Sequence, residues 1–305
     1  MNLRTILCIG ALLLAASCAS RSHDDDNVAD EFGSTLQISH ESPNQAYLGL
    51  WGYDDVLYVV GGTLGENGGV ILKKQGSDFT TDSTPNGPLL WWIHGVDEES
   101  IWAVGESGRI LRRRDTGWQD ESVSIDEKLV LWGVWAASET DVWAVGGSVR
   151  RGGPKGVVLR SRGDGQWRQI NDEHFPNDLN FYKVWGRSPN SVYIVGEGGV
   201  GLFFNGRDFT RIDTGVRDLL FTVHGHPLDA APNFYAVGGA NMGMIFRSEY
   251  GENWVQESIP AVPGLNGVAV VSKNAVLAVG NRGTMLFRMG NANWQRIANA
   301  QTNSV

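Results

Sequence analysis

The stretch DVWAVG, from Asp141 to Gly146, decides how this chain folds. It is apolar on both alternations, short, and closed by a Val-Gly pair that recurs along the chain. The glycines of successive pairs lie 44, 41, 50, 42 and 42 residues apart. Self-similarity at a period of 40 to 50 residues is typical of propeller blades. The six pairs are Val60-Gly61, Val104-Gly105, Val145-Gly146, Val195-Gly196, Val237-Gly238 and Val279-Gly280.

Each repeat reads as four short strands. The first is apolar and has Trp, His or Ala near its end, the second is the DVWAVG-type strand, the third follows a Gly turn, and the fourth begins at an aromatic residue. The residues near the end of the first strand are Trp51, His94, Trp135, Trp185, His224 and Ala269, and those that open the fourth are Phe79, Trp118, Trp167, Phe209, Trp254 and Trp294. A basic residue is expected after the third strand of five repeats, at Lys73, Arg112, Arg160, Arg247 and Arg288, with Phe204 in the sixth, all pointing outward to cover blade edges.

These patterns exclude a βαβ fold, because crossover helices of ten or more residues have no place between the strands. The sequence therefore predicts an all-β, six-bladed β-propeller of four-stranded antiparallel blades over residues 34–300, with a tail at 301–305. Thr35 to Ser39 (TLQIS) resembles a fourth-strand segment and is left over after six blades are counted.

Composition supports this fold and narrows the partners. The chain has 305 residues with 40 Gly, 12 Trp and 42% hydrophobic residues, which excludes collagen and simple disorder. Its formal net charge of −9 argues against a nucleic-acid partner, which requires a basic face. The repeat places nine Trp in packing columns and leaves Trp91, Trp92 and Trp132 outside them.

The N-terminus predicts a cellular address. One basic residue precedes the apolar run Ile6 to Leu14, which is too short to span a bilayer, so residues 1–17 are predicted to be a signal peptide. Ala15-Ala16-Ser17-Cys18 resembles the lipobox of bacterial lipoproteins. The resemblance implies acylation of Cys18, including chains such as palmitate, and Ala19 after it implies the outer membrane. Residues 18–33, acidic at Asp24 to Asp26, are predicted to be a flexible tether, and the envelope lipoprotein faces either the periplasm or the exterior.

The repeats resemble bacterial propellers with BNR or Asp-box-like motifs, including photosystem II assembly factor and sialidase-type propellers. The nearest motif stretches are Arg247 to Trp254 (RSEYGENW) and Ser161 to Trp167 (SRGDGQW), which depart from the Asp-box spacing. The resemblance implies the architecture and transfers no activity.

Possible metal ligands are few. His94 and His224 occupy the position that is Trp in other repeats, and His224 and His226 alone supply two ligands with no third. We interpret these histidines as packing or surface residues, and the sequence predicts no metal, no cofactor and no catalytic residue.

Two features suggest a recognition surface on one propeller face. The loop from Gly147 to Gly156 is long and basic, at Arg150, Arg151 and Lys155. Four aromatic residues precede the Trp or His position by three residues: Trp91, Trp132, Tyr182 and Phe221. Aromatic and Arg side chains are favoured at recognition surfaces, although an ordinary core role for the aromatic set stays open.

The sequence therefore favours a non-enzymatic, lipid-anchored scaffold with a monomeric head that binds a protein partner or an envelope glycan. An alternative is a glycoside hydrolase or lyase with Glu106 and Glu197, which stand at a turn position, as acids. A purely structural surface lipoprotein is the third hypothesis.

Overall fold

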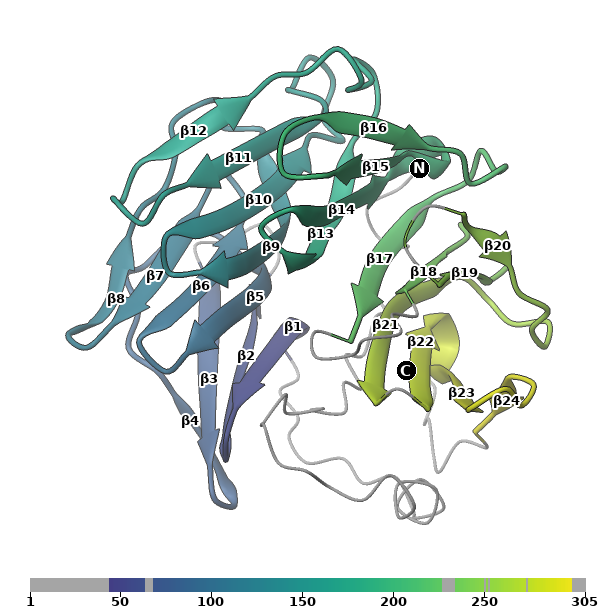
Figure 1. The fold of residues 1–305 in the computed structure, drawn as a ribbon. Coiled ribbons are helices and arrows are strands. Elements are labelled where there is room, and N and C mark those ends of the chain that lie inside the picture. Colours follow the sequence, from purple (N-terminus) through teal and green to yellow (C-terminus); the bar gives the residue numbers. More distant parts are fainter. Residues whose placement is uncertain are drawn as a thin grey trace.

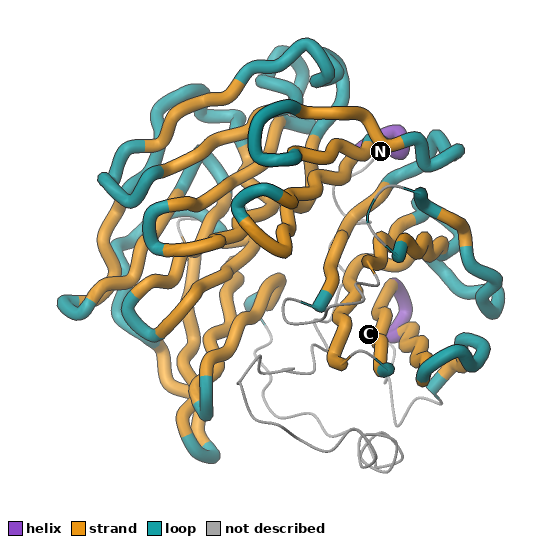
Figure 2. The backbone as a smooth tube through the Cα atoms, viewed as in Figure 1, coloured by secondary structure: helices purple, strands orange, loops and turns teal. Residues whose placement is uncertain are grey.

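The chain folds into six four-stranded antiparallel sheets arranged around a common axis (Figure 1). This is a computed structural model, which describes residues 44–63, 68–226, 234–249, 251, 253–272 and 274–297. Each sheet uses four strands that are consecutive in the chain, so each repeat is one blade. Strands and loops make up nearly all of the described backbone, apart from two short 3-10 turns, η3 (Glu197–Gly199) and η4 (Asn281–Gly283) (Figure 2). The predicted all-β, six-bladed propeller is confirmed.

Within each blade the strands run outward from the axis in chain order (Figure 1). Blade one comprises β1 (Ala46–Tyr53), β2 (Val56–Thr63), β3 (Gly68–Gln75) and β4 (Asp78–Thr81). Blade two comprises β5 (Leu90–Asp97), β6 (Ser100–Gly105), β7 (Ile110–Arg114) and β8 (Gly117–Asp120). Blade three comprises β9 (Val130–Ser138), β10 (Asp141–Gly147), β11 (Val157–Ser161) and β12 (Trp167–Ile170).

The second half of the ring repeats this order. Blade four comprises β13 (Phe181–Ser188), β14 (Ser191–Gly196), β15 (Gly201–Phe204) and β16 (Phe209–Ile212). Blade five comprises β17 (Leu220–Gly225), β18 (Phe234–Gly238), β19 (Met244–Ser248) and β20 (Val255–Gln256). Blade six comprises β21 (Leu265–Ser272), β22 (Ala275–Gly280), β23 (Thr284–Met289) and β24 (Gln295–Arg296).

The second strand of each blade explains why DVWAVG is apolar on both alternations. Every residue of β6, β10, β14 and β18 is buried, because neighbouring blades cover both faces of the sheet. In blade one the corresponding strand β2 is covered less completely, since Leu57 and Val59 are only half-buried.

Neighbouring blades meet through the residue near the end of each inner strand. A Cβ added to Gly95, Gly186 or Gly225 would lie only 2.9, 2.6 or 2.7 Å from the Cη2 of a Trp on the preceding blade. These tryptophans are Trp51, Trp135 and Trp185 respectively. Each indole therefore packs on a glycine of the next inner strand, where only glycine leaves room for the ring.

Histidine replaces Trp where the next blade lacks that glycine. His94 faces Ala136, whose backbone N–H donates to His94 Nδ1 at 3.2 Å. His224 faces Val270 in the same way, with its Nδ1 accepting the Val270 N–H at 3.2 Å. Two kinds of interface result, Trp on glycine and His on a residue with a Cβ, and the packing role predicted for His94 and His224 agrees with these contacts.

The third strands correct one sequence expectation. The residues in register with the second-strand aromatic column are Lys73, Arg112, Arg160, Phe203, Arg247 and Phe287. Phe204 and Arg288 lie one residue further on, so both assignments were wrong by one position. The arginines also do not all point outward, because Arg112 is 3% exposed and stacks on Trp102 with its Cζ 4.8 Å from the ring centroid. Arg160 lies over Trp143 at 4.3 Å in the same arrangement.

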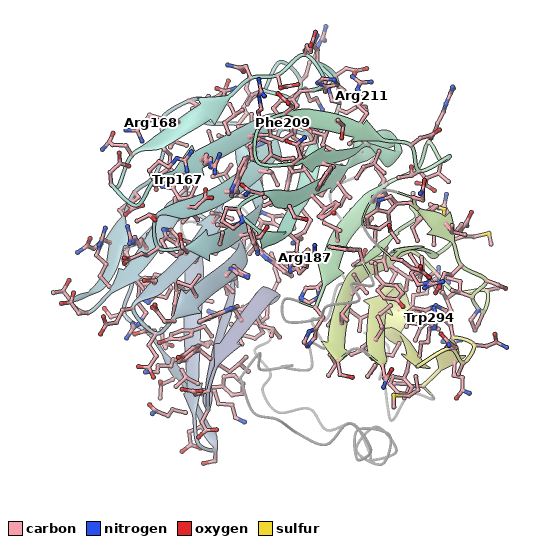
Figure 3. All side chains as sticks on the ribbon, in the orientation of Figure 1. Trp167, Arg168, Arg187, Phe209, Arg211 and Trp294 are labelled. Carbon is pink, nitrogen blue, oxygen red and sulfur yellow. The ribbon has the colours of Figure 1, made fainter. Side chains whose placement is uncertain are left out.

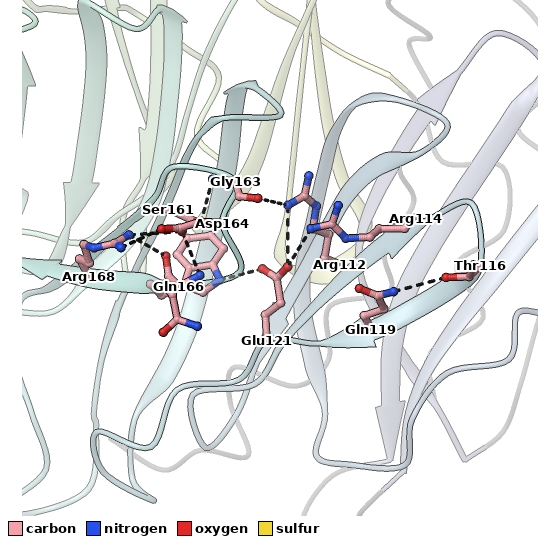
Figure 4. A network of polar contacts seen from close by, with 11 residues as sticks. Arg112, Arg114, Thr116, Gln119, Glu121, Ser161, Gly163, Asp164, Gln166 and Arg168 are labelled. Carbon is pink, nitrogen blue, oxygen red and sulfur yellow. Dashed lines mark hydrogen bonds and ion pairs between the residues drawn. The ribbon is translucent and has the colours of Figure 1, made fainter.

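The fourth-strand indoles fasten neighbouring blades at the rim. Trp167 Nε1 donates to Glu121 Oε2 at 3.1 Å, and Glu121 belongs to the link that follows β8 of the preceding blade (Figure 4). Arg112 also lies 3.8 Å from the Glu121 carboxylate. Two other indoles make the equivalent bond: Trp118 donates to Asp82 at 2.9 Å, and Trp294 donates to Glu257. Asp82 and Glu257 directly follow the fourth strand of the preceding blade, as Glu121 does. Figure 3 shows Trp167 and Trp294 on the outer parts of their blades and Arg187 close to the axis.

Five of the blade interfaces share extensive contacts between inner strands. Each inner strand packs on the next, from β1 on β5 through to β17 on β21. Within the described ranges, β21 and β1 show no packing of comparable extent. We refer to the boundary between blade six and blade one as the seam.

The signal peptide, Cys18, the acidic tether and the TLQIS segment lie outside the described residues, as does the tail at 301–305. In the part of the chain that is described, no helix is long and apolar enough to cross a bilayer.

Candidate functional site

A β-bulge interrupts every inner strand at the same place. In each case the pairing with the second strand skips one residue just before the residue paired with the Val of the Val-Gly motif. The skipped residues are Leu48, Trp91, Trp132, Tyr182, Phe221 and Asn266. Bulges re-aim side chains, so the aromatic set found in the sequence comes from one repeated backbone device.

Three of these rings form a continuous run across blades three, four and five. The ring centroids of Trp132 and Tyr182 lie 5.1 Å apart, and those of Tyr182 and Phe221 lie 5.4 Å apart. Trp132 is 9% exposed, whereas Tyr182 and Phe221 are half-buried. Burial raises the pKa of the Tyr182 hydroxyl, with a further rise from the Glu197 carboxylate, so this hydroxyl is neutral and able to donate. Trp132 therefore belongs to the core, whereas the Tyr182 and Phe221 rings are partly accessible to solvent.

The basic loop of blade three stands beside this aromatic run. Ser148 is buried, its N–H donates to Asn180 Oδ1 at 2.9 Å, and its hydroxyl accepts the N–H of Arg150 at 3.0 Å. Asn180 ends the link between β12 and β13, so the loop is fixed to the edge of blade four. Arg150 and Arg151 are exposed, and neither guanidinium has an ion pair among the described residues.

Lys155 and Glu197 connect the loop to the next blade. Lys155 Nζ lies 3.9 Å from Glu197 Oε2, and both side chains are about one-third exposed, at 31% and 35%. The same Glu197 oxygen accepts the backbone N–H of Asn180 at 3.1 Å and its Nδ2 at 2.9 Å. Glu197 is therefore engaged in holding the β12–β13 link, which favours the turn interpretation of this residue.

Glu106 has a different environment. Burial raises its pKa, against the lowering effects of Arg150 and of a contact with the Trp91 indole. The Trp91 indole nitrogen is itself buried, and within the described chain it has no hydrogen bond of ordinary geometry. The partly buried Glu106 carboxyl, the Arg150 guanidinium and the Trp91 indole N–H therefore lie together beside the aromatic run.

The predicted face residues are thus brought to one end of the propeller. We call Arg150, Arg151, Lys155, Trp91, Trp132, Tyr182 and Phe221 the loop face. Trp132 is in ring contact with Tyr182, and Tyr182 with Phe221, while the Trp91 indole lies beside Glu106. Its assignment as a binding site stays a prediction.

His94 and His224 pack between neighbouring blades. Burial lowers the pKa of His94 to about 3 and that of His224 to about 4. Each uses Nδ1 as an acceptor for a backbone N–H. Among the residues described, no group of three His, Cys, Asp or Glu side chains is placed to hold a metal ion.

Sequence reasoning missed Lys183. The residues of the six inner strands that pair with the Val of the Val-Gly motif are Gly49, Trp92, Gly133, Lys183, Thr222 and Gly267. Lys183 reaches back past blade three to place Nζ 3.1 Å from the centroid of the Trp92 ring, and it donates to the Trp132 carbonyl at 3.3 Å. It is 7% exposed and has no carboxylate partner in the described ranges, and burial holds its pKa well below the ordinary value. Lys183 of blade four therefore contacts both blade three, at the Trp132 carbonyl, and blade two, at the Trp92 ring.

Three solved structures are similar to this chain at low sequence identity. A structure of YCF48 bound to a D1 peptide has 14% identity and a TM-score of 0.58, covering 86% of this chain and 87% of that one. YCF48 from Cyanidioschyzon merolae has 13% identity and a TM-score of 0.58, covering 83% and 85%. The WD40 propeller domain of Doa1 has 10% identity and a TM-score of 0.63, covering 85% of both chains. No protein-family model and no curated protein matches the chain. At these identities the likeness shows the fold alone.

Proposed function

We propose that this protein is a non-enzymatic scaffold that binds a protein partner through the loop face. The proposal rests on two exposed guanidinium groups, Arg150 and Arg151, which form no ion pair within the described ranges. They stand on a loop that Ser148 and Asn180 hold beside a run of aromatic rings. A fixed loop loses little conformational entropy on binding, and Arg and aromatic residues are enriched at binding hot spots.

The charges indicate which partner fits. The chain is acidic overall, so a basic loop on it is a local exception that favours a segment bearing carboxylates. YCF48 has been solved with a peptide bound, which is an example of a similar fold in a peptide complex.

A recovery experiment tests this function. The purified protein is used as bait in an envelope extract, and the proteins it retains are identified by mass spectrometry. Changing Arg150, Arg151 and Lys155 to Ala together is expected to lower recovery of a specific partner at least tenfold. The matched control changes Arg162, Arg168 and Arg207 to Ala, which removes the same charge from the outer parts of blades three and four. Equal recovery by the two triple variants would refute the loop face as the site.

Two finer statements belong to the same proposal. We propose that acylated Cys18 anchors the chain in a bacterial outer membrane, which metabolic labelling with a clickable palmitate analogue and Cys18→Ser would test. A glycan partner is distinguished from a protein by treating the extract with protease, because a glycan survives this treatment and a protein does not.

Glu106 provides the one observation in favour of an enzyme. Its raised pKa, caused mainly by burial, is a property of general acids. Glu197, its proposed counterpart, is occupied by Asn180. Turnover of peptidoglycan fragments or sialosides that is lost in Glu106→Gln would favour a hydrolase or lyase.

A further inference from the structure

A glycine follows the Trp or His position in four inner strands, and at three of them a Trp ring of the preceding blade packs against it. Gly95, Gly186 and Gly225 each have a Trp ring of the preceding blade against them. Gly52 of blade one stands at the same place in its inner strand, one residue after Trp51. Among the described residues, the atoms nearest to a Cβ added there belong to its own blade, with Val56 O at 3.1 Å and Leu57 Cδ1 at 3.5 Å. The residue of blade six that corresponds to the incoming Trp is Ala269.

The face of blade one around Gly52 is apolar and incompletely covered. Leu50 and Val59 pair with each other on this face, and Leu57 lies beside them opposite Gly52. All three are half-buried. The residues that correspond to Leu50 in the other five blades, namely Ile93, Val134, Val184, Val223 and Val268, are all buried. Among the described residues, the seam thus has no aromatic ring against Gly52, and aliphatic side chains surround this position.

The chain contains one segment suited to fill it. The first 43 residues hold a single Phe, Tyr or Trp, which is Phe32. From Phe32 to Ser39 (FGSTLQIS) apolar Phe32, Leu36 and Ile38 share one alternation with Ser34, while the other alternation is Gly33, Thr35, Gln37 and Ser39. Such alternation is typical of a strand with one face covered and one in water.

The position of β1 makes the seam reachable. The described chain begins at Asn44, directly before β1, and β1 is the inner strand on the blade-one side of the seam. His40 to Asn44 (HESPN) has the Ser, Pro and Asn composition of a turn. A reversal centred on Ser42 brings Phe32, ten residues before it, level with Gly52, ten residues after it.

We propose that the segment from Phe32 to Ser39 occupies the seam, with the Phe32 ring over Gly52. The segment supplies to blade one the aromatic contact that Ala269 of blade six does not supply. The ring of blades is then completed by the chain preceding β1, and blades six and one are joined through that segment.

Cross-linking tests the position. In a full-length chain with Cys8 and Cys18 changed to Ser, the pair Phe32→Cys and Gly52→Cys is expected to form a disulfide within one chain under mild oxidation. The matched control pairs Phe32→Cys with Asp78→Cys, which is exposed on β4 of the same blade. Cross-linking no greater than in this control would overturn the proposal, and a disulfide between chains would replace it by a contact with a second copy.

Thermal unfolding tests the energetics. Phe32→Ala should lower Tm by on the order of 5 °C, because it removes a buried ring from a chain of this size. Ala269→Trp distinguishes direct closure of blade six on blade one. If Trp at position 269 raises Tm while Phe32→Ala leaves it unchanged, Gly52 receives blade six, and the proposal is wrong. Neither result depends on the loop face or its partner.

Discussion

His94 and Ala136 meet across the boundary between blades two and three, where the ring nitrogen Nδ1 accepts the Ala136 backbone N–H at 3.2 Å. At the neighbouring boundaries the corresponding pairs are Trp51 with Gly95 and Trp135 with Gly186. The Cβ of Ala136 leaves too little space for an indole. The smaller imidazole fits there, and although it buries less ring area than an indole it accepts a backbone hydrogen bond. The residue at the inserting position, Trp or His, therefore matches the size of the residue that receives it on the next blade.

This matching of sizes predicts a compensating pair of substitutions. His94→Trp alone should destabilise by about 2 kcal/mol because the indole meets the Ala136 Cβ. Ala136→Gly alone should also destabilise, by about 1 kcal/mol, because glycine weakens a strand interior. The double variant rebuilds a Trp-on-glycine interface and should recover most of the loss in urea unfolding. Additive losses would show that the two positions are independent.

Stability is expected to fall on acidification below pH 6.5. Burial lowers the pKa of His94 to about 3 and of His224 to about 4, so the unfolded state binds protons that the folded state does not. Each imidazole then reduces the free energy of unfolding by about 1.4 kcal/mol per pH unit below its unfolded pKa of about 6.5. This loss continues to about pH 4 for His224 and about pH 3 for His94. In the double variant of His94 and Ala136 the contribution of His94 disappears, so urea titrations should show a shallower slope; an unchanged slope would contradict the assignment.

Lys183→Met should stabilise the protein at neutral pH. Burial holds the pKa of the Lys183 amine well below its ordinary value, and the amine lacks a carboxylate in the described chain, so burying it lowers the stability of the folded state. Stability of the unmodified protein should rise with pH up to the unfolded lysine pKa of about 10.4, because the unfolded state binds the extra proton. Chemical unfolding at pH 7 and pH 9 should show that rise in the unmodified protein and a smaller one in Lys183→Met. Lys183→Ala, which leaves a void beside Trp92, separates packing from charge.

The rim bonds differ in strength according to their acceptor. Trp167 donates to the Glu121 carboxylate, whereas Trp254 donates to the Gly251 carbonyl at 3.0 Å. Hydrogen bonds to charged groups contribute about 1.5–3 kcal/mol, against about 1 kcal/mol for neutral pairs. Trp167→Phe should therefore cost more in thermal unfolding than Trp254→Phe, which makes the same change in ring size. Equal losses would place the effect in ring packing.

The repeat made the blades and the packing columns predictable, because a Trp at a fixed distance from Val-Gly marks one register position in every copy. The register of the third strands is harder to predict, because the length of the turn before them varies between blades. In blade six, for example, Phe287 and not Arg288 occupies the column position. The bulges do not change the spacing of the repeat. The sequence therefore indicated the positions of Trp132 and Tyr182 but not the direction in which their side chains point. Lys183 had no local signal, because its contacts, Trp92 and Trp132, come from two other blades.

The pairing of Trp with glycine and of His with a bulkier residue limits how the repeats can be rearranged. A recombinant that joined blade two directly to blade four would set His94 opposite Gly186 and leave a hole the size of the missing benzo ring. One that joined blade one to blade three would drive Trp51 into Ala136. Duplication or exchange of a single repeat would therefore keep its packing only where both neighbouring blades offer the matching residue.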